Sequence, residues 1–452
     1  MPVSLHRWIV GAMSLSMLWL IGCGRPPRPQ APATQAIDST SEQVDLSGMT
    51  DLSFVSTDYP MWRNADQNSV EPDRDVPTEW SAESGLAWST DVPGRGHSSP
   101  IVVGQQVFLT TADDRAQTQS VVAYDLQTGH QQWVAQCHAG NLPNVHRKNS
   151  HASATPASDG SHVFVAFIHG QGLYVTALDL EGHQLWQTEV GPFASEHGYG
   201  ASVTLWKGLV LVNGDSAGNG YEAALHGDSG AIVWRTPRPG VGQHGSYASP
   251  IVAELAGRTQ LVQSGLGRVA SYDPLTGEEL WSCRGPAEVT ANTLAFKDPY
   301  VIVSGGYPDK EILCIRADGS GDVTDSHIVW RNSRNVAYVP SPVVVGEKLY
   351  CVTDNGVAAC FALSDGKMLW QHRLGGAFSA SPLVIGKRFY IPNEGGEVHV
   401  FEIDPEFKEL AVNRLSDEGG MASIVVSGNQ LLIRTEHKLF CIGTPQKVAM
   451  QR

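Results

Sequence analysis

The chain has 452 residues, of which 42% are hydrophobic, and its formal charge is −15 because 46 acidic residues outnumber 31 lysines and arginines. This balance excludes a protein whose main partner is nucleic acid, since phosphate binding needs surfaces rich in lysine and arginine. The 47 glycines are typical of many short strands joined by tight turns.

The first 22 residues have the pattern of a lipoprotein signal peptide. Arg7 precedes an apolar run over residues 8–20, which is too short for a stable membrane span. The run ends in Leu-Ile-Gly-Cys-Gly, which resembles the lipobox of bacterial lipoproteins. Cleavage there leaves Cys23 as a lipidated N-terminus that anchors the chain; the alternative is ordinary secretion with an incidental cysteine. Because Gly24 is not an inner-membrane retention Asp, we expect the periplasmic face of the outer membrane.

Residues 23–57 follow as a separate segment. The part after the cysteine is rich in Pro, Gln, Ser and Thr, and it lacks the apolar residues needed for a core. We therefore expect a disordered linker between the lipid and a folded body over residues 58–445.

Tryptophans divide the folded body at intervals of 40 to 53 residues, which is the size of one propeller blade. Five of the seven stand four residues after a glycine, as Trp281 follows Gly277. A short hairpin often needs one residue with positive φ, which glycine adopts without penalty, and an indole suits the gap between adjacent blades. We predict that these residues dock the blades: Trp88, Trp133, Trp186, Trp234, Trp281, Trp330 and Trp370.

Apolar, β-branched runs bounded by Gly and Asp or Asn fill each interval, and no segment has a helical period. The sequence predicts an all-β protein, an eight-bladed β-propeller of four-stranded antiparallel blades, with seven blades as the alternative. The last repeat, over residues 420–441, contains three strands. We expect the segment that ends at Trp88 to add the fourth and close the ring, which removes exposed sheet edges. The polar stretch 317–326 predicts a longer outer hairpin in the fifth blade.

Two cysteines flank a predicted turn. If Asn355 and Gly356 form a two-residue turn, Cys351 and Cys360 face each other across a hairpin and can form a disulfide; the alternative is two buried free thiols. The cysteine spacings match no metal motif, and we predict no metal site.

Four histidines precede the first strands of successive blades. Because first strands line the channel of a propeller, these imidazoles can gather at one mouth of it, where they could bind a shared ligand, a partner or a metal. The alternative is that each caps its strand or bonds a loop carbonyl. The candidate funnel site comprises His97, His151, His197 and His244, with Arg95, Arg147, Tyr338 and Glu418 nearby.

The Gly-x-x-x-Trp ending resembles the repeat of the pyrroloquinoline-quinone (PQQ) propeller superfamily, over about residues 58–443. A lipobox followed by eight such blades is similar to the propeller lipoprotein of the outer-membrane β-barrel assembly machinery. The chain looks closest to secreted bacterial PQQ-like propellers, which open with a Trp-Arg pair, here Trp62-Arg63, and a Gly-His-Ser-Ser-Pro first blade, here residues 96–100.

The quinone alcohol dehydrogenases of this superfamily use adjacent cysteines, a catalytic Asp and calcium ligands. This chain has no Cys-Cys pair, and the calcium ligands of those enzymes cannot be placed on matching positions in it. The resemblance therefore implies a fold more than a ligand.

We expect a non-catalytic envelope lipoprotein that acts as a protein-interaction scaffold, with a role similar to outer-membrane protein assembly. It would bind envelope proteins through a monomeric body, with no cofactor and no nucleic acid. The alternative is a dehydrogenase of alcohols or sugars that depends on PQQ and calcium.

Overall fold

The computed structural model describes residues 51–217, 219–240, 243–416 and 418–444. The expected signal peptide, Cys23 and most of the expected linker lie outside these residues. The described residues form strands and no helix, so none of their segments could cross a membrane as a helix.

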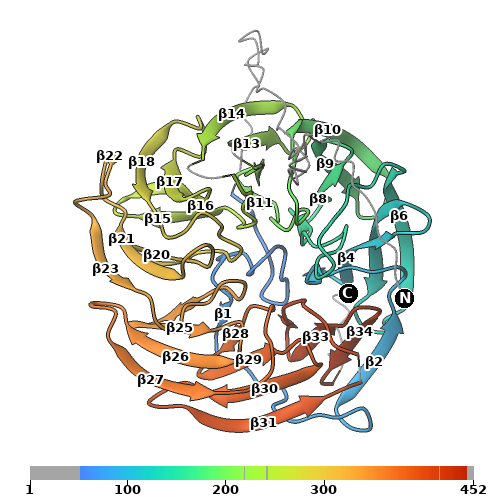
Figure 1. Cartoon of the computed structure of the whole chain (residues 1–452). Coiled ribbons are helices and arrows are strands. Elements are labelled where there is room, and N and C mark those ends of the chain that lie inside the picture. The colour runs from blue at the N-terminus through green and yellow to red at the C-terminus, as the bar shows by residue number, and fades with distance from the viewer. Residues whose placement is uncertain (1–50, 218, 241–242, 417, 445–452) are drawn as a thin grey trace, which may run out of the picture. The chain divides into compact units, whose positions relative to one another are not determined.

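The strands form eight sheets arranged in a ring, which confirms the eight-bladed propeller (Figure 1). Blade 1 comprises β3 (Ile101–Val103), β4 (Gln106–Asp113), β5 (Thr118–Asp125) and β6 (Gln131–Ala139). Blade 2 comprises β7 (Ala157–Ser158), β8 (His162–His169), β9 (Gly172–Asp179) and β10 (Gln184–Pro192). Blade 3 comprises β11 (Thr204–Trp206), β12 (Leu209–Asn213), β13 (Asn219–His226) and β14 (Ile232–Pro239). Blade 4 comprises β15 (Ile251–Leu255), β16 (Arg258–Gly265), β17 (Arg268–Tyr272) and β18 (Glu279–Arg284).

The second half of the ring repeats this arrangement. Blade 5 comprises β19 (Ala295–Lys297), β20 (Tyr300–Gly305), β21 (Glu311–Arg316) and β23 (Ile328–Asn332). Blade 6 comprises β24 (Val343–Val345), β25 (Lys348–Val352), β26 (Val357–Ala362) and β27 (Met368–Arg373). Blade 7 comprises β28 (Leu383–Ile385), β29 (Arg388–Pro392), β30 (Glu397–Glu402) and β31 (Lys408–Arg414). Blade 8 comprises β32 (Val425–Ser427), β33 (Gln430–Arg434), β34 (Lys438–Ile442) and β2 (Leu86–Asp91).

Blade 8 joins the two ends of the described chain. β2 pairs antiparallel with β34, and Trp88 lies opposite Cys441. The predicted closure is confirmed. Backbone hydrogen bonds between segments about 350 residues apart therefore hold the ring shut, and β34 is not left as an unpaired edge strand.

Each repeated glycine lies against the tryptophan of the preceding blade. Gly277 has φ +70°, and a Cβ added to it would sit 2.5 Å from Cε3 of Trp234. The indole N–H of Trp234 donates to the carbonyl oxygen of Pro274 in the same turn, at 3.0 Å. The glycine thus serves both the turn and the ring contact. The same ring contact occurs for Gly129 and Trp88, Gly182 and Trp133, Gly230 and Trp186, and Gly366 and Trp330.

Two of the seven tryptophans depart from this rule. Trp281 donates instead to Oε1 of Gln260 in its own blade, at 2.7 Å, because the insertion replaces the glycine turn of blade 5. Trp370 packs against Phe407, with ring centroids 5.9 Å apart. These two contacts were not foreseen from the repeat.

The polar insertion of blade 5 is longer than the other outer hairpins, as expected, but it also forms a short strand. This strand, β22 (Gly321–Asp322), pairs in parallel with β18 of blade 4. It gives that blade a fifth strand and connects two neighbouring blades.

The segment before blade 1 crosses the ring (Figure 1). Tyr59 bridges to Val102 of blade 1, and β1 (Val70–Glu71) pairs in parallel with β28 of blade 7. Between them, the side-chain oxygen Oε1 of Gln67 accepts from the backbone N–H of Val252 in blade 4. Contacts with blades on opposite sides require the segment to pass across one end of the channel.

The predicted disulfide is wrong. Cys351 lies opposite Ala359, and Cys360 lies opposite Tyr350, so the two thiols are free and project from opposite faces of blade 6. The amide of Thr353 bonds the carbonyl of Val357, so three residues, and not two, form the turn. A shift of one residue in register moves every side chain to the other face.

Candidate functional site

The channel is a funnel with a volume of about 500 Å³. Its wall carries one buried hydroxyl from each blade, and aromatic side chains of Trp62, Tyr247, Tyr338 and Phe378 also line it. The eight hydroxyl residues are Ser99, Thr155, Ser202, Ser249, Thr293, Ser341, Ser381 and Ser423.

These hydroxyls form a ring of hydrogen bonds between blades. Seven backbone N–H groups donate to the hydroxyl of the next blade, at N···O distances of 2.8 to 3.1 Å. At the eighth position, the hydroxyl of Thr293 accepts instead from the indole N–H of Trp62, at 2.8 Å. The ring was not predicted. Its signal was the Ser or Thr that stands before a Pro at the start of several first strands, as in Ser341-Pro342.

The crossing segment closes the floor of the funnel. Arg63 is 1% exposed, and its guanidinium donates to the carbonyl oxygens of Thr293, Leu294 and Pro342, which belong to blades 5 and 6. Burial lowers the pKa of Arg63 to about 10, so the side chain keeps its charge near neutral pH and must remain hydrogen-bonded. The Trp62-Arg63 pair is therefore the plug of a blind funnel.

Two of the four predicted histidines lie in the funnel wall. His97 and His197 line it together with His146, whose ring centroid is 5.2 Å from that of His197. Burial and the charges of Arg95 and Arg434 lower the pKa of His97 to about 4, and burial also lowers the pKa of His197. Nδ1 of His97 is buried and has no hydrogen-bond partner among the described residues.

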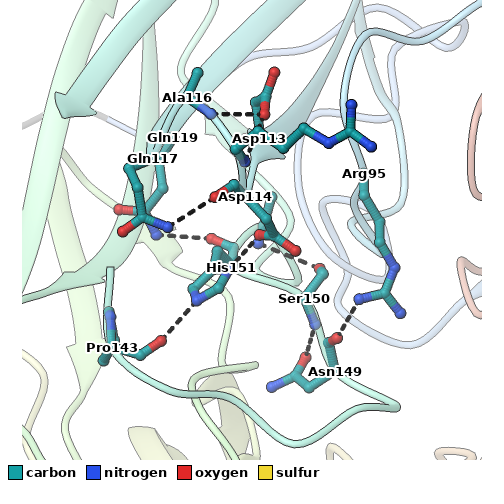
Figure 2. Close-up of polar contacts among 12 residues, drawn as sticks. Arg95, Asp113, Asp114, Ala116, Gln117, Gln119, Pro143, Asn149, Ser150 and His151 are labelled. Atoms are coloured by element: carbon teal, nitrogen blue, oxygen red, sulfur yellow. Dashed lines mark hydrogen bonds and ion pairs between the residues drawn. The ribbon is translucent and has the colours of Figure 1, made fainter. Parts of the chain in front are cut away.

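The other two histidines support loops outside the funnel. Figure 2 shows the ring of His151 between two acceptors: Nδ1 is 2.8 Å from Oδ1 of Asp114, and Nε2 is 2.7 Å from the carbonyl oxygen of Pro143. Nδ1 of His244 is 2.6 Å from Oε1 of Glu288. These two side chains therefore follow the alternative, in which each histidine holds its own loop.

The charged residues at the mouth bind one another. Arg95 pairs with Glu436 and also donates to the carbonyl oxygen of Asn149, at 2.8 Å (Figure 2). Lys148, which the sequence did not single out, pairs with Glu394 of blade 7 at 3.0 Å. This contact holds the loop between blades 1 and 2 over the funnel.

Of the remaining predicted residues, Tyr338 lines the funnel, and its amide donates to Asp354 at 2.9 Å. Arg147 is exposed at the surface, where its carbonyl oxygen accepts from Arg95. Glu418 lies away from the funnel wall and bonds His437 at 3.2 Å. The structure thus brings together about half of the predicted residues.

The funnel does not fit a calcium-bound quinone. Its carboxylates are engaged, since Glu394 pairs with Lys148 and Asp354 accepts two backbone N–H groups. Among the described residues, no group of three or more His, Cys, Asp or Glu side chains could hold a metal ion, and no cysteine lines the wall. An anionic quinone would also have to displace Glu394 from the one lysine in the wall.

The sequence matches a family described as the outer membrane protein assembly factor BamB, over residues 69–217, 146–322 and 319–431. No curated protein matches the chain in sequence.

Several solved structures share the fold. BamB from Moraxella catarrhalis is 16% identical with a TM-score of 0.55, and the match covers 80% of this chain and 98% of that one. A europium-containing methanol dehydrogenase is 12% identical with a TM-score of 0.61, covering 86% and 98%. The computationally designed Ika8 protein is 13% identical with a TM-score of 0.56, covering 78% and 98%. At these identities the likeness shows the fold alone.

Proposed function

The chain belongs to the family of the outer membrane protein assembly factor BamB, and from this premise we propose that it is a non-catalytic scaffold of the cell envelope that binds other envelope proteins. The proposal includes a role in outer-membrane protein assembly, which is the activity named for that family. It also includes export, cleavage before Cys23 and a lipid anchor at the periplasmic face of the outer membrane.

The observation that carries the proposal is the mutual neutralisation of the charged groups at the funnel mouth. Lys148 pairs with Glu394, and Arg95 pairs with Glu436. A general base works best when its pKa lies near the operating pH, whereas burial lowers the pKa of His97 to about 4. These features support a rigid binding body in preference to a reaction centre.

A dehydrogenase that uses PQQ and calcium is the alternative. The fold of the europium-containing methanol dehydrogenase is similar, but this likeness extends to the fold alone. The two carboxylates that line the funnel are already engaged and are too few for the six to eight oxygen ligands that calcium takes, and we derive no reaction step through a quinone.

One experiment separates the two functions. The purified mature chain is incubated with PQQ and calcium, then assayed for a bound quinone absorbance and for dye-linked oxidation of alcohols and sugars. In parallel, envelopes that carry the chain are treated with a crosslinker and analysed by mass spectrometry. We expect no dehydrogenase activity and reproducible crosslinks to a small set of envelope proteins; quinone-dependent turnover would refute the scaffold.

A further inference from the structure

Two outer strands of the propeller have related sequences but different surroundings. β18 reads Glu-Leu-Trp-Ser-Cys-Arg and β27 reads Met-Leu-Trp-Gln-His-Arg. Leu, Trp and Arg therefore occupy the same strand positions in both: Leu280, Trp281 and Arg284 in β18, and Leu369, Trp370 and Arg373 in β27. The edge of β18 is covered by β22, whereas β27 is the last strand of its sheet.

The cover over β18 shows what such an edge can bind. Gly321 of β22 lies opposite Trp281, and the N–H of Val323 donates to the carbonyl oxygen of Ser282, at 2.8 Å. Val323 is 1% exposed and Trp281 is fully buried. The added segment thus satisfies edge backbone groups and covers the apolar face of the outer strand.

The same segment places an acid beside the arginine of β18. Hydrogen bonds from Thr324 and then the charge of Arg284 hold the pKa of Asp322 below its ordinary value. The N–H of Arg284 also donates to the hydroxyl of Thr324, at 3.0 Å. An extended segment with alternating acidic and apolar residues therefore matches the edge of β18.

No further strand covers the edge of β27 among the described residues. Phe407 of blade 7 packs on the face that carries Trp370, and the side-chain amide of Asn335 donates to Oε1 of Gln371, at 2.7 Å. Met368 is 40% exposed and Leu369 is 48% exposed, whereas the equivalent Leu280 is partly buried. Trp370 has a buried indole nitrogen with no hydrogen-bond partner in the described chain. Met368 and Leu369 are the exposed side chains that a strand in the position of β22 would cover.

The backbone of β27 can accept such a strand. The N–H of Leu374 donates to the carbonyl oxygen of Gly356 in the β26 hairpin, at 2.8 Å. Because hydrogen-bonded and non-hydrogen-bonded pairs alternate in an antiparallel ladder, the N–H and C=O groups of Gln371 and Arg373 face away from β26. They are free to pair with an added strand.

The charge at this edge selects an acidic segment. β27 contains no acidic residue, and no described carboxylate lies within ion-pair distance of Lys367, Arg373 or the nearby Arg334. The exposed cations of β23 and β31 pair with carboxylates, as Arg331 of β23 pairs with Glu311. The exposed Arg284 of β18 forms no ion pair, but its charge acts on Asp322 of β22. The three cations Lys367, Arg373 and Arg334 make the edge of β27 locally basic on a chain with a net charge of −15.

We propose that the edge of β27 is a docking site for an extended, acidic and apolar segment of an envelope protein, which adds to blade 6 as β22 adds to blade 4. Addition of a strand to an exposed sheet edge is an established mode of peptide recognition, in which backbone bonds provide affinity and side chains provide specificity. This inference rests on the proposed scaffold function and assigns it a surface.

The test uses a synthetic peptide with the sequence of residues 317–326, which carries three aspartates, and a second peptide with these replaced by lysine. The full mature chain is labelled at its methionine methyl groups and titrated by NMR. Met368 reports binding at the edge, whereas Met421 lines the funnel and reports binding there. We expect the aspartate peptide to shift the Met368 signal and the lysine peptide to leave it unchanged.

Three variants test the mode of binding. Gln371→Pro removes an outward N–H without breaking the ladder to β26, since proline is tolerated on edge strands. Gln371→Ala removes the side chain and keeps that N–H, so it is the matched control. We expect Gln371→Pro and Arg373→Glu to raise the Kd at least tenfold, and Gln371→Ala to change it less than twofold. A shift of Met421 instead of Met368, no shift at all, or equal binding by Gln371→Pro would overturn the proposal.

Failure of the docking site can be told apart from failure of the scaffold function. A photocrosslinking residue is placed in envelope-borne chains at position 371, at position 134 of another outer strand, or at position 421 in the funnel. Acidic extended segments crosslinked at 371 support the proposal, and crosslinks confined to the other positions overturn it but leave the scaffold function intact. No crosslink at any position refutes both. Crosslinks at 371 to a second copy of this chain also overturn the proposal.

Discussion

Replacement of Gly277 by alanine tests how the blades dock. The residue has φ +70°, and an added Cβ would lie 2.5 Å from Cε3 of Trp234. A side chain in the left-handed region costs about 1–2 kcal/mol, and overpacking costs about 1–3 kcal/mol more. We therefore expect Gly277→Ala to lower the free energy of unfolding by about 2–5 kcal/mol.

Gly257 offers a matched control. It has φ +77°, and nothing lies within 4 Å of an added Cβ. Gly257→Ala therefore carries the backbone strain without the ring contact, and it should cost about 1–2 kcal/mol. The two variants are compared in urea titrations followed by circular dichroism.

A double-mutant cycle isolates the ring. In a Trp234→Leu background, the ring contact is removed but Oγ1 of Thr236 still lies 2.7 Å from the added Cβ. Gly277→Ala should therefore cost less than in the wild-type background, though more than Gly257→Ala. The coupling free energy between positions 234 and 277 should exceed about 1 kcal/mol. Equal costs for Gly277→Ala and Gly257→Ala in the wild-type background would refute the docking role of the glycine.

Three further variants test the interior of the ring. Burial lowers the pKa of His97 from 6.5 to about 4, so the unfolded chain binds this proton before the folded chain does as the pH falls through that window. His97→Gln should therefore reduce the loss of stability between pH 6.5 and 4, and it should leave the pH dependence of stability unchanged above pH 7. Urea titrations at several pH values measure both effects. Arg238 and Asp215 form a fully buried ion pair at 2.8 Å, so Arg238→Met should lower the free energy of unfolding by about 3–5 kcal/mol because it leaves the carboxylate unpaired. Adding Asp215→Asn should recover part of that loss, and stability effects that simply add in the double variant would contradict this account. Ser341→Ala removes one acceptor from the hydroxyl ring and should lower stability by about 1–2 kcal/mol in thermal unfolding, whereas the exposed Ser161→Ala should have no measurable effect; equal effects would argue against the ring.

The blade count could be predicted because each repeat must solve the same local problem. A turn needs a residue with positive φ, and the gap between twisted sheets needs a large apolar ring, so Gly and Trp recur with the blade. The three strands of the last repeat likewise implied that another part of the chain had to supply the fourth. Both predictions depend on patterns within one repeat or on counting repeats.

The candidate site was only partly predictable. His97 and His151 each precede a first strand, yet His97 lines the funnel while His151 holds its loop through Asp114 and Pro143. The long loop between blades 1 and 2 brings His146 and Lys148 to the mouth instead. Whether a side chain points into the channel or away from it depends on the length of the loop that carries it, and the repeat pattern does not encode this length.

The sequence by itself thus determined the closed all-β ring, because turn chemistry and apolar period act over a few residues. Only the tertiary structure decided the register of Cys351 and Cys360, the plug at Arg63 and the hydroxyls that meet around the axis. The plug and the hydroxyl ring depend on hydrogen bonds between segments tens to hundreds of residues apart. The register of the two cysteines depends on the length of a single turn, and a shift of one residue there reverses which face a side chain occupies.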